Sequence, residues 1–73
     1  MNEKKNLKIF RDNLLRLTET AGMKQSEVAL GMGMNRKVVN HWYTGHNAVS
    51  IFNLPRLAKV LDCTIDDLLE GCE

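Results

Sequence analysis

The chain has 73 residues, which is enough for one domain with one hydrophobic core. Hydrophobic residues form 44% of it and charged residues 26%, as in ordinary soluble globular proteins, and no apolar run reaches membrane-spanning length. Net charge is only +1, but residues 1–61 carry ten Lys or Arg against four Asp or Glu, whereas residues 62–73 carry five acidic groups and no basic one. This asymmetry suits a protein that faces phosphate on one side, although the acids also suit a helix start and a solvated tail.

The first three predicted helices cover about residues 7–21, 24–32 and 36–43. In the first, Asn6 is the expected N-cap, Gly22 marks the end, and apolar residues recur at three- and four-residue steps. This stripe, which we expect to be buried, consists of Leu7, Phe10, Leu14 and Leu17.

The second and third predicted helices have the spacing of two short helices joined by a sharp turn. Ala29 is small enough for a close helix crossing, and Gly33 can adopt the left-handed conformation that the turn requires. Asn35 is the expected N-cap of the third helix, whose inward residues are Val39 and Trp42. Val28 and Met32 are also expected to face inward from the second helix, and packing is the expected role of Met32 and Met34.

Two further short helices are predicted after a loop over residues 45–52. The fourth begins near Asn53, with Pro55 in its first turn, and its apolar face contains Leu54, Leu57, Ala58 and Leu61. The fifth follows Thr64 as N-cap, with Asp67 three residues later in a variant of the capping box, and ends at Gly71. Its apolar residues are Ile65, Leu68 and Leu69.

The predicted fold class is all-α, a compact five-helix bundle in which helices two and three form a helix-turn-helix. We expect a single domain over residues 1–73, with an ordered core at about residues 7–71 and short polar tails. A helix-turn-helix indicates that the protein reads DNA sequence.

With these elements in order, the chain resembles the lambda-repressor-like (Cro/XRE) helix-turn-helix family over roughly residues 7–71. The residues that carry the resemblance in the motif are Gln25, Ala29, Gly33, Val39, Trp42 and Gly45. The segments from Leu54 to Ala58 and from Thr64 to Leu69 resemble the fourth and fifth helices of that family.

The sequence departs from the family pattern in three ways. Lys24 stands where a Thr or Ser often caps helix two, so a favourable side-chain cap is expected to be missing. Thr18 and Tyr43 occupy the positions of a frequent Arg–Glu ion pair, and a neutral contact is expected in its place. Gly31 lies in the last turn of helix two and is expected to weaken it by up to about 1 kcal/mol relative to Ala.

The resemblance implies that the third helix enters the major groove. The residues then expected to contact bases are Arg36, Lys37, Asn40 and His41, all of which can donate hydrogen bonds. Arg36 can bond the O6 and N7 of guanine together, which predicts at least one G in each half-site. The alternative for Arg36 and Lys37 is a solvated basic turn.

A second set of residues is expected to contact the DNA backbone: Gln25, Lys24, Asn35, Thr44, His46 and Asn47. The resemblance implies that Gln25 contacts a phosphate and braces the first residue of the recognition helix. The alternative for Gln25 is a simple helix start. The amides of the loop after helix three are also expected to donate to the DNA backbone.

Nothing in the sequence indicates catalysis, a cofactor or a metal site. Cys63 and Cys72 lack metal-ligand spacing and are expected as thiols, and His41 with His46 does not form a recognised zinc pattern. Asp66 and Asp67 diverge on a helix and cannot share an active site. An enzyme is therefore not expected, nor is a small-molecule ligand.

The resulting prediction is a cytoplasmic, sequence-specific regulator of transcription that binds double-stranded DNA and no membrane. Homodimers on a near-palindromic operator are expected, with half-sites about one helical turn apart, roughly 34 Å. Candidate dimer residues are Ile51, Phe52 and the apolar residues of helix five. The alternative is a protein-interaction module, such as the antitoxin of a toxin–antitoxin pair.

Overall fold

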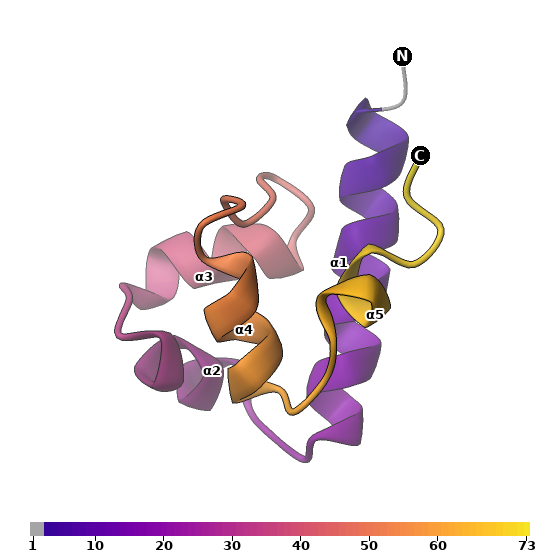
Figure 1. The fold of residues 1–73 in the computed structure, drawn as a ribbon. Coiled ribbons are helices and arrows are strands. Elements are labelled where there is room, and N and C mark those ends of the chain that lie inside the picture. Colours follow the sequence, from indigo (N-terminus) through magenta and orange to yellow (C-terminus); the bar gives the residue numbers. More distant parts are fainter. Residues whose placement is uncertain (1–2) are drawn as a thin grey trace.

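The computed structural model describes residues 3–73, which form five helices and no strand. The helices are α1 (Glu3–Thr20), α2 (Gln25–Met32), α3 (Arg36–Tyr43), α4 (Leu54–Val60) and α5 (Ile65–Leu69). The long α1 forms one side of the molecule, α5 lies against it, and α2, α3 and α4 form the other side (Figure 1). The all-α fold class predicted from the sequence is confirmed.

One hydrophobic core joins all five helices. Its fully buried side chains are Leu14 from α1, Val28 and Met32 from α2, Val39 from α3, Leu57 from α4 and Leu68 from α5. Phe10, Trp42, Ala29, Leu54, Ala58 and Leu61 are also buried, and Met34 and Cys63 pack against the cluster from partly exposed positions. The predicted inward faces of helices two, three and four are therefore confirmed, and Trp42 belongs to the core.

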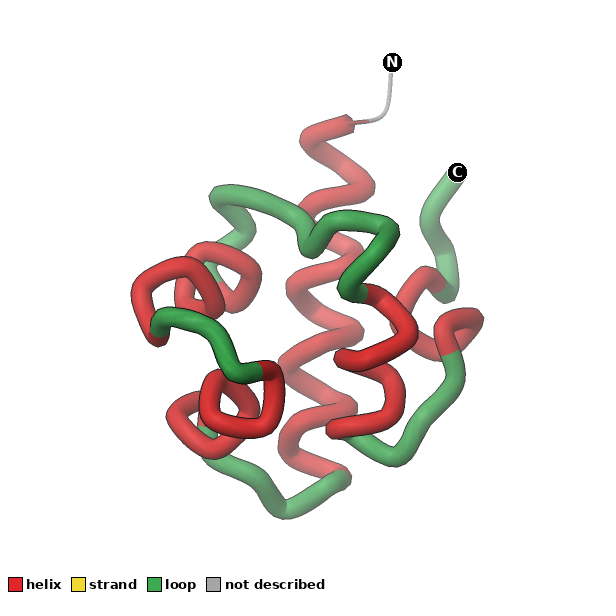
Figure 2. The backbone as a smooth tube through the Cα atoms, turned by 60° about the vertical axis from the view of Figure 1, so that its left-hand side comes forward, coloured by secondary structure: helices red, strands yellow, loops and turns green. Residues whose placement is uncertain are grey.

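The turn between α2 and α3 has the predicted chemistry. Gly33 has φ 66°, in the left-handed region that a residue with a side chain rarely adopts. Its N–H donates to Leu30 O at 3.1 Å, and the N–H of Met34 donates to Ala29 O at 3.1 Å. These bonds satisfy carbonyls at the end of α2 and turn the chain into α3, so that the two helices lie side by side across a short connection (Figure 2).

The start of α1 differs from the prediction. The helix begins at Glu3 rather than Leu7, so Asn6 is inside it and is not an N-cap. The Asn6 side chain instead holds the end of the chain, because its Nδ2 donates to Glu73 O at 2.9 Å and its Oδ1 accepts from Glu73 N at 3.0 Å. Because the tail engages the side-chain amide of Asn6, this amide does not compete for main-chain hydrogen bonds within the helix. Met1 and Asn2, in the predicted polar tail, lie outside the described residues.

The capping box of α5 is present as predicted. Thr64 Oγ1 accepts from Asp67 N at 3.0 Å, and Asp67 Oδ2 accepts from Thr64 N at 3.0 Å. The hydrogen bond from the Thr64 backbone is the main reason that the pKa of Asp67 lies below its usual value. The fifth helix is thereby held to its predicted first turn, with Gly71 in the left-handed region just beyond its end.

Gly31 has a packing role that the sequence did not reveal. A Cβ at this position would lie 3.1 and 3.2 Å from the two methyl carbons of Val60. Glycine therefore allows α2 to approach α4 closely, which offsets its poor helix propensity.

Candidate nucleic-acid interface

The outward face of α3 is positioned by its cap and by its buried residues. Asn35 Oδ1 accepts from Lys37 N at 2.7 Å, which fixes the first turn, and Val39 and Trp42 anchor the opposite face in the core. The four side chains predicted to contact bases therefore lie together on the accessible side of α3. Arg36, Lys37 and Asn40 are exposed and His41 is half-buried.

Arg36 and Lys37 are the free cations of this face. Within residues 3–73, neither side chain has a hydrogen-bond or ion-pair partner. An exposed guanidinium and ammonium without a partner can bond guanine acceptors or phosphate without first breaking a protein contact.

Gln25 braces Asn40, one turn later than the resemblance implied. Its Nε2 donates to Asn40 Oδ1 at 2.9 Å, joining the first residue of α2 to the middle of α3. The expectation that Gln25 braces the first residue of the recognition helix is therefore wrong, because its side chain reaches the second turn of α3. Since Asn40 Oδ1 accepts this bond, its Nδ2 is left to face an acceptor on a base or a phosphate.

The turn after α3 folds back on the helix end. Thr44 N donates to Asn40 O at 3.0 Å, and the amides of His46 and Asn47 donate to His41 O at 3.0 and 3.2 Å. The expectation that loop amides donate to the DNA backbone is therefore wrong for His46 and Asn47, because a carbonyl at the end of α3 uses both of their amides. Thr44 Oγ1 also donates to His41 O at 3.3 Å. Of these three residues, only His46 and Asn47 therefore have side chains without a hydrogen bond to the protein main chain in the described residues.

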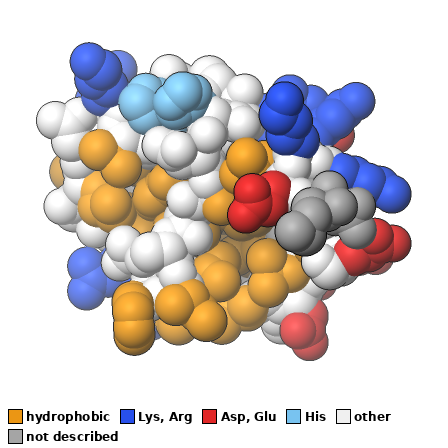
Figure 3. All heavy atoms as spheres, turned by 90° about the horizontal axis from the view of Figure 1, so that it is seen from above, with side chains coloured by type: hydrophobic (Ala, Val, Ile, Leu, Met, Phe, Trp, Pro, Cys, Tyr) orange, Lys and Arg blue, Asp and Glu red, His pale blue; other side chains and the backbone are white. Residues whose placement is uncertain are grey.

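His41 and His46 are in ring contact, with centroids 4.8 Å apart and planes inclined at 54°. This contact links the recognition face of α3 to the turn that follows it. In Figure 3, histidine side chains lie along one edge between Lys and Arg side chains, whereas hydrophobic side chains gather along the opposite edge.

Lys24, another residue predicted to contact the DNA backbone, lies at the start of α2. Lys24 is exposed and is the N-cap of that helix, and its side chain has no acceptor atom with which to cap it. The expected lack of a side-chain cap is confirmed, although Glu27 Oε1 accepts from Lys24 N at 2.8 Å and satisfies that amide.

Two polar features of α1 were not predicted from the sequence. Asn13 is buried, and its Nδ2 donates to Leu68 O at 3.0 Å and to Glu70 O at 2.8 Å, which ties α5 to α1. Lys4, Lys8 and Arg11 line a groove together with the turn after α3. Their spacing of four and three residues, which places them on one flank of a helix, was the available signal.

The described residues also bear on metal binding, disulfide bonding and membrane insertion. Residues 3–73 contain no group of three or more His, Cys, Asp or Glu side chains that could hold a metal ion. Cys63 and Cys72 are both free thiols. In the same range, every helix is too short or too polar to cross a lipid bilayer.

Comparison with known proteins agrees with this geometry. Residues 13–71 match the family model of the Cro/C1-type HTH DNA-binding domain. Among solved structures, the chain is similar to the restriction-modification controller protein C.AhdI from Aeromonas hydrophila, with a TM-score of 0.80 and 30% sequence identity over 88% of this chain and 97% of that one. No curated protein sequence matches. The match over most of the chain shows that this protein belongs to the Cro/C1-type helix-turn-helix family of DNA-binding domains.

Proposed function

We propose that this protein regulates transcription by reading a near-palindromic operator as a homodimer, with α3 of each copy in the major groove. The observation that carries the proposal is the exposed Arg36 and Lys37 pair, which has no partner within residues 3–73 and begins the recognition helix. The similarity to a protein named as a controller supports a regulatory role.

The roles of the base-contacting residues follow from their donors. Arg36 bonds the O6 and N7 of a guanine, and Lys37 reaches either a guanine or a phosphate. Asn40, whose Oδ1 is held by Gln25, donates from Nδ2 to a base acceptor, and His41 bonds a neighbouring base edge. Lys24, Asn35, His46 and Asn47 contact the sugar-phosphate backbone through their side chains, whereas the Thr44 hydroxyl already donates to His41 O.

An apolar surface beside α4 supports dimer formation. Ile51 and Phe52, in the loop before α4, are 73% and 91% exposed, and Ile65 and Leu69 of α5 are also exposed in part. Large apolar side chains at such exposure indicate a surface that a partner covers. A second copy is the proposed partner, because two half-sites give the specificity that one small module lacks.

In-vitro selection of random duplexes with the purified chain tests this function. The expected result is a palindromic sequence with at least one guanine in each half-site. In Arg36→Ala, the base preference should be lost or relaxed at one base pair of each half-site. Sedimentation equilibrium should show a dimer that Phe52→Ser weakens. Recovery of no preferred sequence, with binding instead to a partner protein, would favour the antitoxin-like alternative.

A further inference from the structure

A groove on the molecule joins the first half of α1 to the end of the recognition helix. Its volume is about 370 Å³, and its walls are Lys4, Leu7, Lys8 and Arg11 on one side and Thr44, Gly45 and His46 on the other. None of the three cationic residues belongs to the helix-turn-helix. The groove therefore extends the polar surface beyond the elements that read bases.

The two walls lie close together. A Cβ at Gly45, which has φ 78°, would lie 3.4 Å from Arg11 Cδ, so the turn after α3 lies against α1. His46 lines the groove and also contacts the ring of His41 on α3. A continuous surface thus leads from the recognition face, through the two imidazoles, to the lysines of α1.

The charge of the groove is unbalanced. No acidic residue lines it, and Lys4 and Lys8 have no ion-pair partner within residues 3–73. Arg11 is paired with Asp12 at 3.0 Å, which leaves two free ammonium groups. Glu3 precedes Lys4 in sequence but lines a different cavity.

Helix stability does not explain these lysines. Lys4 and Lys8 are a like-charge pair four residues apart, which destabilises a helix slightly. Lys4 also lies in the first turn of α1, where the macrodipole disfavours a cation. Residues that break a local rule without a structural gain commonly serve binding.

We propose that this groove takes the phosphate backbone of duplex DNA that flanks the half-site read by α3. The inference rests on the proposed function and lengthens its footprint by about two phosphate contacts per subunit. The ligand chemistry is a row of phosphates beside free ammonium groups, and these contacts add affinity without sequence preference.

The test compares the salt dependence of binding to two duplexes. Both contain the selected operator, one trimmed to its ends and one with ten additional base pairs on each side. The variant is Lys4→Gln with Lys8→Gln, which removes both free charges and keeps good helix formers.

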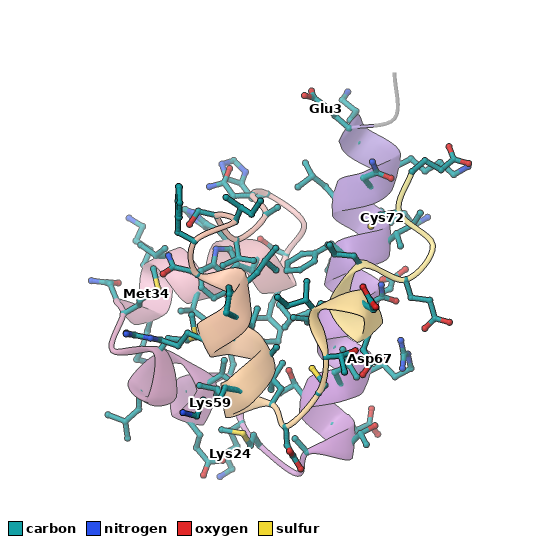
Figure 4. All side chains as sticks on the ribbon, in the orientation of Figure 1. Glu3, Lys24, Met34, Lys59, Asp67 and Cys72 are labelled. Carbon is teal, nitrogen blue, oxygen red and sulfur yellow. The ribbon has the colours of Figure 1, made fainter. Side chains whose placement is uncertain are left out.

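The matched control is Lys5→Gln with Lys59→Gln. These substitutions remove the same charge from two exposed lysines that do not line the groove. Lys59 lies on α4, far from Glu3 at the start of α1 (Figure 4). Lys5 shares its flank of α1 with Ile9, whose side chain faces Gly71, and with Arg16, which pairs with Glu70 at 3.7 Å.

On the long duplex, the magnitude of the slope of log K against log salt should fall by about 1.8 per subunit in the groove variant, because each of the two lost phosphate contacts contributes about 0.9 to that slope. Affinity at low salt should fall roughly tenfold or more. The control should keep the wild-type slope, and the groove variant should match wild type on the trimmed duplex. Circular dichroism should show equal helix content in all three proteins.

Two different failures can be told apart. If the wild-type chain selects an operator but the groove variant and the control have the same slope on the long duplex, the groove proposal is wrong and the proposed function stands. If the wild-type chain binds no duplex, both are wrong.

Discussion

The hydroxyl of Thr18 and the phenol of Tyr43 lie 2.7 Å apart in the buried contact between α1 and α3. Thr18 Oγ1 is also 2.7 Å from Leu14 O, to which it can only donate. Its one proton is therefore used, so Tyr43 must donate to Thr18. The neutral contact expected in place of an ion pair is present, and it fixes the end of the recognition helix against α1.

The direction of this hydrogen bond predicts unequal costs for its two deletions. Tyr43→Phe removes the donor and should lower the free energy of unfolding by about 0.5–1.5 kcal/mol. Thr18→Val leaves the buried phenol without an acceptor and should cost about 1–3 kcal/mol. Urea denaturation of both variants and of Thr18→Ser, which keeps the hydroxyl, measures the difference. Equal costs would contradict the assigned donor.

Tyr43 also predicts a loss of stability in alkali. Burial raises the pKa of Tyr43 above its usual value of 10.0, and the hydrogen bond to Thr18 offsets part of this shift. Because the pKa is higher in the folded state, the contribution of the protonated phenol to folding stability is complete below about pH 10. This contribution is lost as the pH rises through the pKa of the folded state. The stability difference between wild type and Tyr43→Phe should therefore shrink between pH 9 and pH 11 in urea denaturation. A constant difference would show that the phenol does not titrate with unfolding.

Gly31 and Val60 should be energetically coupled. Alanine at position 31 gains helix propensity of up to about 1 kcal/mol but presses on the Val60 methyl groups. Gly31→Ala should therefore be neutral or destabilising in the wild type and stabilising in Val60→Ala. A double-mutant cycle of unfolding free energies measures the coupling, and additive effects would show that α4 moves aside without cost.

Gln25 and Asn40 should be coupled in DNA binding. Gln25→Ala releases the Asn40 amide, so it should weaken binding to all sequences and also relax preference at the base pair that Asn40 faces. In an Asn40→Ala background, the second effect should disappear. The coupling energy, from fluorescence anisotropy on the operator and on a duplex changed at that pair, should be about 0.5–3 kcal/mol. Strictly additive losses would mean that Gln25 acts on phosphate alone.

Local sequence determined most of the helices, because caps, glycines and apolar periodicity act over a few residues. Asn35, Gly33 and the Thr64–Asp67 box all function as predicted, and the start of α3 needed no information beyond its neighbours. The exposed basic residues of α3 follow from the same periodicity, since Val39 and Trp42 leave only one face free.

The tertiary structure decided which hydrogen bonds and shared surfaces form between segments that are far apart in the chain. Asn6 became part of α1 because Glu73 satisfies its amide, and Asn13 became a buried bridge because α5 ends beside it. The reach of Gln25 to Asn40 and the groove between Lys8 and Gly45 likewise depend on how helices cross. A hydrogen bond or a shared surface between residues far apart in the chain exists only after the core has packed, so no local pattern could specify it.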